Sequence, residues 1–265
     1  EAEISLVPVA DGGDGTLETL VEGSGGDIRE ASVTGPLGDR ITAQWGAMGD
    51  GRTAVIEMAR TSGLVLVPPE KRTPLLSTTF GWGEAIMQAL EAGFRTFIIG
   101  IGGSATNDAG AGMAQALGIR LFNSDRHDLP YGGAALAELD KIDLSGLDPR
   151  ATDSEFLVAC DVSNPLTGPE GASAIYGPQK GATPEMVAQL DSALGHIAAI
   201  VMRDVGKDID QVPGAGAAGG LGGGMMAFLN GELKTGVDIV LETVDLESHL
   251  DGADLVITGE GQMDH

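Results

Sequence analysis

Short runs of apolar residues, separated by glycine-rich turns, recur along the whole chain. Runs of this length that are rich in branched aliphatic side chains are typical of β-strands. The pattern predicts strands at 4–9, 28–33, 41–47, 53–58, 94–101, 119–122, 155–161 and 253–258. Turn residues at 35–38 and 49–51 separate the second, third and fourth of these strands, which predicts a meander.

Helical periodicity marks the segments between several strands. Helices are expected at 16–21, 78–91 and 105–117. The clearest helix begins with Thr183 as its N-cap and Pro184 in its first turn. Its apolar positions have the spacing of one helix face, namely Val187, Leu190, Leu194, Ile197 and Val201.

The strand at 94–101, the helix at 105–117 and the strand at 119–122 form a strand–loop–helix–strand unit. Such units are typical of parallel sheets in α/β proteins. An α/β fold class is therefore expected.

The charge of the chain excludes some partners. With 15 basic and 39 acidic residues, the formal net charge of the 265-residue chain is −24. Nucleic acids and anionic membranes require clustered Lys and Arg, so neither is an expected partner. Carboxylates can hold hard cations such as Mg²⁺. Cys160 is the single cysteine, which excludes an intrachain disulfide and favours a cytoplasmic location.

Both ends of the sequence have the pattern of a fragment. The expected strand at 4–9 begins almost at once, and residue 1 is Glu rather than Met. The expected strand at 253–258 runs into a Gly-Glu-Gly loop and the sequence stops at His265. In α/β proteins a helix normally follows such a loop, so we expect missing sequence on both sides. A short natural domain is the alternative.

A phosphate-binding loop is expected after the strand at 94–101. Residues 100–105 match G-x-G-x-x-A between a strand and a helix, where backbone N–H groups can bind a phosphate. The polar triplet Thr106, Asn107 and Asp108 favours a ligand over packing against a sheet. Asp125 stands roughly where a ribose-binding acid would follow. A structural turn is the alternative.

The densest glycine stretch, at 214–224, matches the same pattern without a preceding strand. Close approach of a nucleotide to the backbone would explain these glycines, and so would dense helix packing. The sequence leaves both explanations open.

Acidic residues follow three expected strands. Asp11 and Asp14 share one glycine-rich loop, where they could hold Mg²⁺ or act as a base, although Asp14 could simply cap a helix. Asp161 and Glu260 are equally compatible with solvated loops. Lys180, in a Pro/Gly loop, is a candidate phosphate contact or a surface lysine.

Six segments of this chain occur in a characteristic order. They are VPVADGGDGT (7–16), TGPLG (34–38), IGIGGSATNDAGAGMAQALG (99–118), YGPQKGA (176–182), GAGAAGGLGGG (214–224) and ADLVITGEGQMD (253–264). Each alone is weakly specific, but the ordered set spans nearly the whole chain and resembles the bacterial-type glycerate kinase family. Members typically begin with a further strand and continue past the last of these segments, which agrees with the expected fragment.

The resemblance implies ATP-dependent phosphorylation of glycerate, with 2-phosphoglycerate as the favoured product and Mg²⁺ on the phosphates. It also implies two α/β domains with the active site in the cleft between them. Residues 1–25 and 252–265 would be part of a flavodoxin-like (Rossmann-like) domain, and 26–251 a larger inserted α/β domain.

On this hypothesis the site residues take three roles. The catalytic candidates are Asp11, Asp14, Asp108 and Lys180, of which Asp11 and Asp14 are also the metal candidates. The candidates for binding substrate or phosphate are Gly102, Gly103, Ser104, Asn107, Gly219, Gly220, Gly222, Gly223 and Glu260.

Two other functions compete with this one. A nicotinamide-dependent oxidoreductase would use residues 100–105 and Asp125, and a non-catalytic domain would bind small acids without turnover. In each case the expected partners are small molecules, with a homo-oligomer as a further possibility.

Overall fold

A six-stranded mixed sheet forms the centre of the molecule. The computed structural model describes residues 4–7, 9–10 and 15–259. The sheet has the order β1-β2-β3-β4-β7-β8, and β5 and β6 form a separate antiparallel pair. The strands are β1 (Asp27–Thr34), β2 (Arg40–Ala47), β3 (Thr53–Glu57), β4 (Thr96–Gly100), β5 (Arg120–Phe122), β6 (Lys141–Asp143), β7 (Glu155–Ala159) and β8 (Glu232–Lys234).

The sheet is antiparallel at one edge and parallel elsewhere. β1 pairs with β2 and β2 with β3 in antiparallel register, which confirms the predicted meander. β3, β4, β7 and β8 are parallel neighbours. The carboxyl ends of these four strands therefore meet at one edge.

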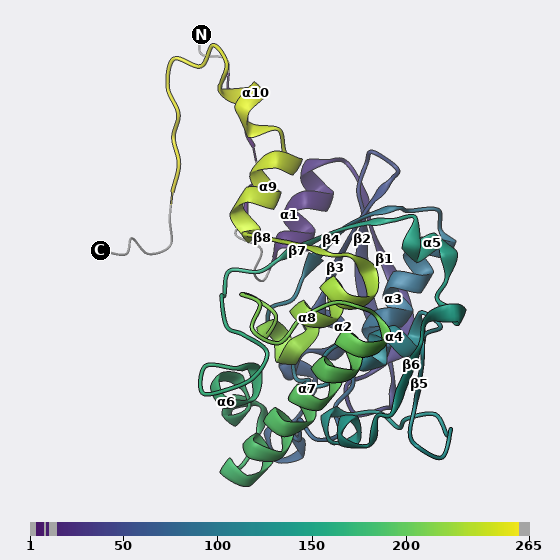
Figure 1. Cartoon of the computed structure of the whole chain (residues 1–265). Helices are drawn as coiled ribbons and strands as arrows, with labels where there is room; N and C mark the ends of the chain where they lie inside the picture. Colours follow the sequence, from purple (N-terminus) through teal and green to yellow (C-terminus); the bar gives the residue numbers. More distant parts are fainter. Residues whose placement is uncertain (1–3, 8, 11–14, 260–265) are drawn as a thin grey trace.

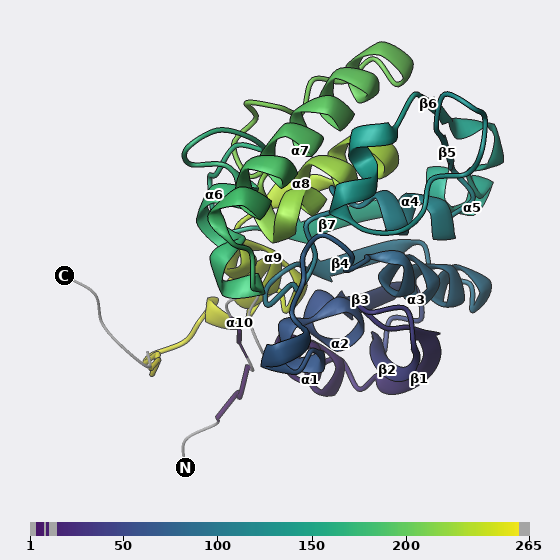
Figure 2. The same cartoon turned by 90° about the horizontal axis from the view of Figure 1, so that it is seen from below.

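Helices cover both faces of the sheet (Figure 1). They are α1 (Thr16–Gly23), α2 (Met58–Ser62), α3 (Phe80–Glu91), α4 (Ala111–Ala116), α5 (Pro149–Thr152), α6 (Ala172–Tyr176), α7 (Pro184–Asp204), α8 (Ala217–Leu229), α9 (Gly236–Thr243) and α10 (Leu246–Leu250). Figure 2 shows α7 and α8 on the side of the sheet opposite α1.

Side chains alternate between two cores, as the two-residue period of a strand requires. Val55 and Ile98 pack in the smaller core with Leu17 of α1 and Ile239 of α9. The next residue of each of these strands belongs to the larger core, which contains Ile56, Ile99, Trp82, Met113 and Leu221. Helix α1 also packs on strands β1, β2 and β3, which follow it in the sequence. The division of the chain into residues 1–25 with 252–265 and residues 26–251 stays a prediction.

The strands expected near the two ends are not formed. Residues 4–7, 9–10 and 253–258 contain no strand, and Leu6 and Ile257 are each 88% exposed. A strand needs a neighbour for its backbone hydrogen bonds, and neither segment pairs with a described strand. Figure 1 shows the C-terminal segment leaving the body of the protein after α10.

The predicted strand–loop–helix–strand unit is confirmed in its order, β4, α4 and β5, but not in the extent of its helix or the pairing of its second strand. Residues 105–110 are not helical, and α4 begins only at Ala111. Ala109 and Gly110 have φ angles of 51° and 73°, which a regular α-helix does not contain. The Asp108 carboxylate accepts hydrogen bonds from the N–H groups of Gly110 and Gly112, in competition with a regular helix. β5 then leaves the main sheet and pairs with β6.

The long helix α7 confirms the prediction from its cap and its apolar face. The Thr183 hydroxyl accepts a hydrogen bond from the Met186 N–H. Leu190, Leu194, Ile197 and Val201 are buried, whereas Val187 is half-buried.

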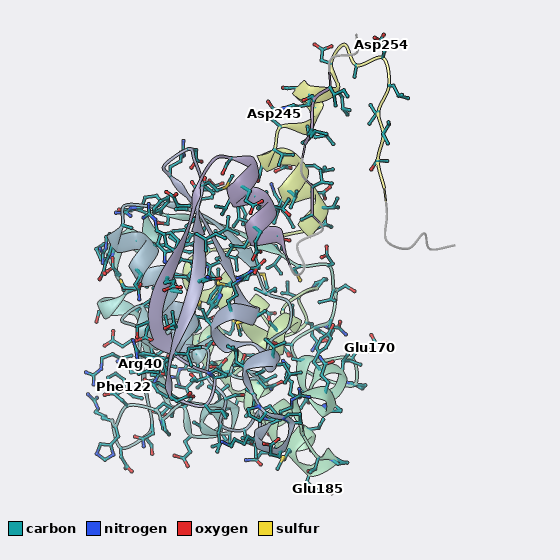
Figure 3. All side chains as sticks on the ribbon, turned by 180° about the vertical axis from the view of Figure 1, so that it is seen from behind. Arg40, Phe122, Glu170, Glu185, Asp245 and Asp254 are labelled. Carbon is teal, nitrogen blue, oxygen red and sulfur yellow. The ribbon has the colours of Figure 1, made fainter. Side chains whose placement is uncertain are left out.

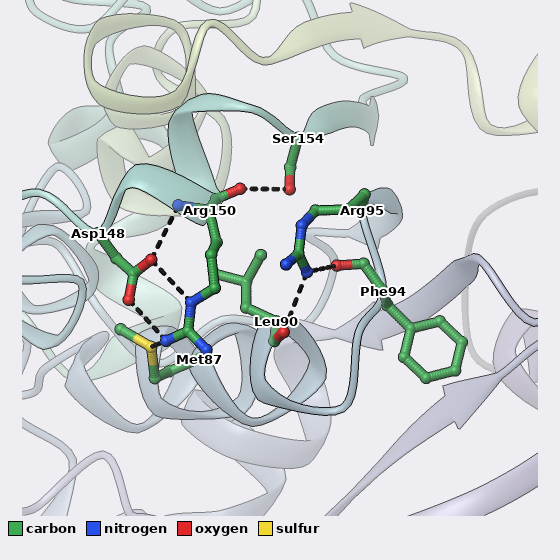
Figure 4. Close-up of polar contacts among 7 residues, drawn as sticks. All are labelled: Met87, Leu90, Phe94, Arg95, Asp148, Arg150 and Ser154. Atoms are coloured by element: carbon green, nitrogen blue, oxygen red, sulfur yellow. Dashed lines mark hydrogen bonds and ion pairs between the residues drawn. The ribbon is translucent and has the colours of Figure 1, made fainter.

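Two arginine side chains contact α3 near its C-terminal end, and one of them, Arg150, comes from the segment before β7 (Figure 4). Arg95 donates to the carbonyl oxygens of Leu90 and Phe94, at the C-terminus of α3. Arg150 makes a bidentate ion pair with Asp148 and also contacts the Met87 sulfur. Cations near the last carbonyls of a helix stabilise its end.

Several acidic side chains lie at the surface. Glu170, Glu185, Asp245 and Asp254 are exposed and lie at the periphery of the molecule in Figure 3. Among the described residues, no helix is both long and apolar enough to cross a membrane.

Candidate functional site

The candidate site lies at the edge where the parallel strands end. Residues 101–110 follow β4, and residues 160–165 follow its neighbour β7. In open α/β sheets, ligands bind outside the carboxyl ends of the strands. The observed edge therefore lies where the sequence predicts a ligand.

The first part of the loop after β4 offers unpaired backbone donors. Gly102 and Gly103 are exposed, and Gly103 has a φ of 68°. Gly103 O accepts from Leu64 N at 2.8 Å and Ala105 N donates to Ser62 O at 2.9 Å, which fixes the loop. The backbone N–H groups of Gly103 and Ser104 donate to none of the described residues. We call Gly103 and Ser104 the nest, because successive backbone N–H groups of a turn can bind an anion.

This anion-binding geometry differs from the predicted one. Because residues 105–110 are not helical, the donors do not belong to a helix N-terminus. The predicted residues Gly102, Gly103 and Ser104 still lie together at the strand edge, in a turn rather than at a helix start.

Lys180 is inside the protein rather than at its surface. It ends a 3₁₀ turn, Pro178–Lys180, and is 1% exposed. Its Nζ donates to Ser104 Oγ at 2.8 Å and to Thr106 O at 2.6 Å. Burial lowers the pKa of Lys180 to about 7, and the charge of Asp108 opposes this shift. The surface-lysine interpretation is therefore wrong.

The Asp108 carboxylate fixes the loop through its hydrogen bonds. It is 1% exposed and accepts from Thr79 N at 2.8 Å and Thr79 Oγ1 at 2.9 Å. It also accepts from Gly110 N and Gly112 N, both at 3.3 Å. Burial raises the pKa of Asp108, and the four donated hydrogen bonds lower it in opposition. Protein donors thus engage its carboxylate, and a catalytic role for Asp108 stays a prediction.

Two polar atoms of the same loop have no described partner. Asn107 Nδ2 donates to Ser173 Oγ at 3.0 Å, but Asn107 Oδ1 accepts no hydrogen bond from the described residues. Thr106 Oγ1 is likewise unpartnered. Both residues are fully buried. Buried polar atoms usually have a partner, so water or a ligand is expected here.

The glycine stretch at the start of α8 packs closely against this loop. A Cβ on Gly219 would lie 2.0 Å from Thr106 O, and one on Gly222 would lie 2.2 Å from Gly214 O. One on Gly220 would lie 2.8 Å from Leu166 Cδ1, whereas one on Gly223 would make only ordinary contacts. Dense packing therefore accounts for Gly219, Gly220 and Gly222, and nucleotide binding at these glycines stays a prediction.

Asp11, Asp14 and Glu260 lie outside the described residues. The structure describes the entry to α1 that follows the first two, where Leu17 N donates to Glu57 Oε1 at 3.0 Å. Arg60 bridges Glu57 and Glu18. A groove of about 510 Å³ between Gly15 and Arg60 opens beside these side chains.

Sequence reasoning missed Glu57, although its position at the end of the strand predicted at 53–58 is the same signal that identified Asp11. At 7% exposed it fixes the start of α1.

Asp161, His196 and Asp125 lie in different parts of the fold. Asp161 Oδ1 accepts from Gly236 N at 2.9 Å, at the start of α9. His196 Nε2 lies 2.6 Å from Leu139 O, a contact within the fold. Asp125 is exposed in a turn after β5, and β5 is not in the main sheet. The ribose-binding position required by an oxidoreductase of the Rossmann type is therefore absent from the described chain.

The chain matches the model of the glycerate kinase family over residues 1–265. The chain belongs to the glycerate kinase family. It is 54% identical to "Glycerate 2-kinase" of Escherichia coli (strain K12) over 264 residues, which cover 100% of this chain and 69% of that protein. It is 56% identical to "Glycerate kinase" of Bacillus subtilis (strain 168) over 263 residues, covering 99% and 69%.

A solved structure agrees with the observed fold. A crystal structure of a protein provisionally named glycerate kinase 2, from Salmonella typhimurium LT2, matches with a TM-score of 0.95 at 54% identity. The match covers 97% of this chain and 70% of that one. Membership of the glycerate kinase family confirms the resemblance and the α/β fold class, and the oxidoreductase hypothesis is wrong.

Proposed function

We propose that this glycerate kinase family member transfers the γ-phosphoryl group of ATP to glycerate and forms 2-phosphoglycerate. The observation that carries the proposal is the nest at Gly103 and Ser104, with the Lys180 ammonium directly behind it. Both substrates are anions, and a protein with a net charge of −24 repels anions in general. A local cluster of donors and one buried cation supplies the attraction that the surface lacks.

The proposed role of the nest is to hold one anionic group still during the transfer. Its ligand would be the glycerate carboxylate or the phosphoryl group that moves. Phosphoryl transfer depends mainly on positioning and on fixed donors that need no reorganisation. In the step itself, a glycerate hydroxyl oxygen forms the bond to phosphorus while the bond to ADP breaks. The hydroxyl proton passes to a base, for which Asp11 and Asp14 are the predicted residues.

The proposal includes Mg²⁺ as the ion that accompanies ATP. When bound, the ion would be held by Asp11 and Asp14 and would neutralise charge that develops on the phosphates. The described carboxylates at the strand edge are engaged: Glu57 accepts from Leu17 N and pairs with Arg60, and Asp161 accepts from Gly236 N. Among residues 15–259, no group of three His, Cys, Asp or Glu side chains could hold a metal ion. Asp11 and Asp14 therefore stay the predicted ligands.

The experiment is an ADP-release assay with Mg·ATP and D-glycerate, on this chain and on the product of the complete gene. Phosphorus NMR of the product distinguishes 2-phosphoglycerate from 3-phosphoglycerate. We expect 2-phosphoglycerate with the complete gene product. Stabilisation of the protein by glycerate without ADP release would instead support the non-catalytic binding domain. A cytoplasmic location and a homo-oligomeric state remain predictions.

A further inference from the structure

The Lys180 ammonium joins two loops that are far apart in the sequence. Its Nζ bonds Ser104 Oγ and Thr106 O, 76 and 74 residues away. Because the side chain is 1% exposed, a ligand at the strand edge does not touch it. The hydrogen bonds of Lys180 therefore reach a ligand only through the segment 104–106.

The hydrogen bond to Lys180 decides what the Ser104 hydroxyl can do. An ammonium group only donates, so Ser104 Oγ must accept from it. The single proton of the hydroxyl is then left for another acceptor, and Ser104 Oγ donates to no described residue. Ser104 adjoins the exposed Gly102 and Gly103, so an anionic oxygen bound at the nest is the acceptor within reach.

A neutral amine would act in the opposite way. Its nitrogen has a lone pair and can accept the Ser104 proton, which removes that donor from the ligand. The charge of Asp108 favours the ammonium form of Lys180. The two hydrogen-bond partners of Lys180, Ser104 Oγ and Thr106 O, are neutral. Burial lowers the pKa of Lys180 to about 7, so the amine changes state within the range of an enzyme assay.

We propose that Lys180 is a positioning residue that keeps the Ser104 hydroxyl proton directed at an anionic oxygen of the substrate. The inference rests on the proposed function for its substrates, since the oxygen belongs either to the glycerate carboxylate or to a phosphate of ATP. The unpartnered Thr106 Oγ1 and Asn107 Oδ1 support it, because protein groups alone do not satisfy this segment.

The test uses Lys180→Met, Ser104→Ala and the double variant in the complete gene product. Lys207→Met is the matched control, since Lys207 Nζ also bonds one backbone carbonyl and one side-chain oxygen, Met226 O and Asn230 Oδ1. KM and kcat are measured for glycerate and for ATP between pH 6 and pH 9.

We expect KM for one of the two anions to rise on the order of tenfold in Lys180→Met and in Ser104→Ala, with kcat changing less. The substrate whose KM rises identifies the oxygen. The double variant should be no worse than Lys180→Met, because both changes remove one donor. In the wild type this KM should rise as the pH increases through about 7, and both variants should lose that dependence. Lys207→Met should keep it.

Unchanged KM values and pH profile in Ser104→Ala would overturn the inference, as would additive effects in the double variant. If Lys180→Met fails to fold, Ser104→Ala still decides, since it keeps the ammonium. If the wild type releases no ADP, the proposed function has failed. Stabilisation of wild type and Ser104→Ala by glycerate or ATP then tests the positioning role separately.

Discussion

Two cationic side chains connect separate segments of this protein in different environments. Lys180 is sealed inside the protein and bonds a hydroxyl and a carbonyl. Arg150 pairs with the half-buried Asp148, and 36% of the Arg150 side chain is exposed to water. Water screens the second contact and leaves its partners hydrated if it breaks, whereas the first has no such alternative. Burial, rather than the number of hydrogen bonds, therefore decides how much each connection matters.

The Asp108 side chain gives the largest expected effect. In Asp108→Ala, four donors lose their acceptor, of which two fix the loop Ala109–Gly110. We expect a loss of at least about 3 kcal/mol in the free energy of unfolding, measured by urea denaturation. Asp148→Ala is the less buried control; it loses the ion pair with Arg150 and the N-cap of α5, and should cost about 1 kcal/mol. A loss below about 1 kcal/mol in Asp108→Ala would contradict the view that burial decides.

Gly219 tests the support that α8 gives to the same loop. An alanine Cβ there would lie 2.0 Å from Thr106 O, at a φ of 72°. We expect Gly219→Ala to lower the free energy of unfolding by about 2–4 kcal/mol, from backbone strain and the clash together.

Gly168→Ala separates these two causes. Gly168 has a φ of 94° but nothing within 4 Å of the added Cβ, so only the strain remains. A loss of about 1 kcal/mol is expected there. Equal losses in the two variants would show that contact with Thr106 contributes nothing.

The pH dependence of stability tests the buried ammonium itself. The pKa of Lys180 falls from 10.5 in the unfolded chain to about 7 in the fold. Between these values the unfolded chain binds more protons, so this group makes the free energy of unfolding increase as the pH rises from about 7 towards 10. Lys180→Met should flatten that increase, measured by urea denaturation at several pH values. An identical pH slope in wild type and variant would show that Lys180 does not change state on folding.

Local patterns predicted the parts of the fold that need no distant partner. The α7 helix carries its cap at Thr183 and its apolar face in its own residues, and the turns of the meander are local as well. The strands expected at 4–9 and 253–258 depend on pairing partners, which a hydrophobic pattern does not contain. The helix expected at 105–117 begins only at Ala111, because one side chain, Asp108, competes for backbone donors before it.

The candidate site was predictable in composition but not in geometry. The glycines and polar residues at 102–108 stand out in the sequence, and the structure places them at the strand edge. The Pro/Gly loop around Lys180 gave no sign that its lysine would be buried, because that depends on packing against residues 104–106. The glycines of α8 left two explanations open until their neighbours were known.

Arg150→Ala gives the smallest expected effect and tests the comparison at the more exposed of the two cations. The variant loses a bidentate ion pair and a contact with Met87, which is as many polar contacts as Lys180 makes or more (Figure 4). If contacts decided, it would be at least as damaging as Lys180→Met. Because both partners can be hydrated, we expect a change in the urea midpoint close to experimental error, and smaller still in 0.5 M NaCl. A clear loss of stability that persists in salt would mean that Arg150 acts by packing on Met87 rather than by charge.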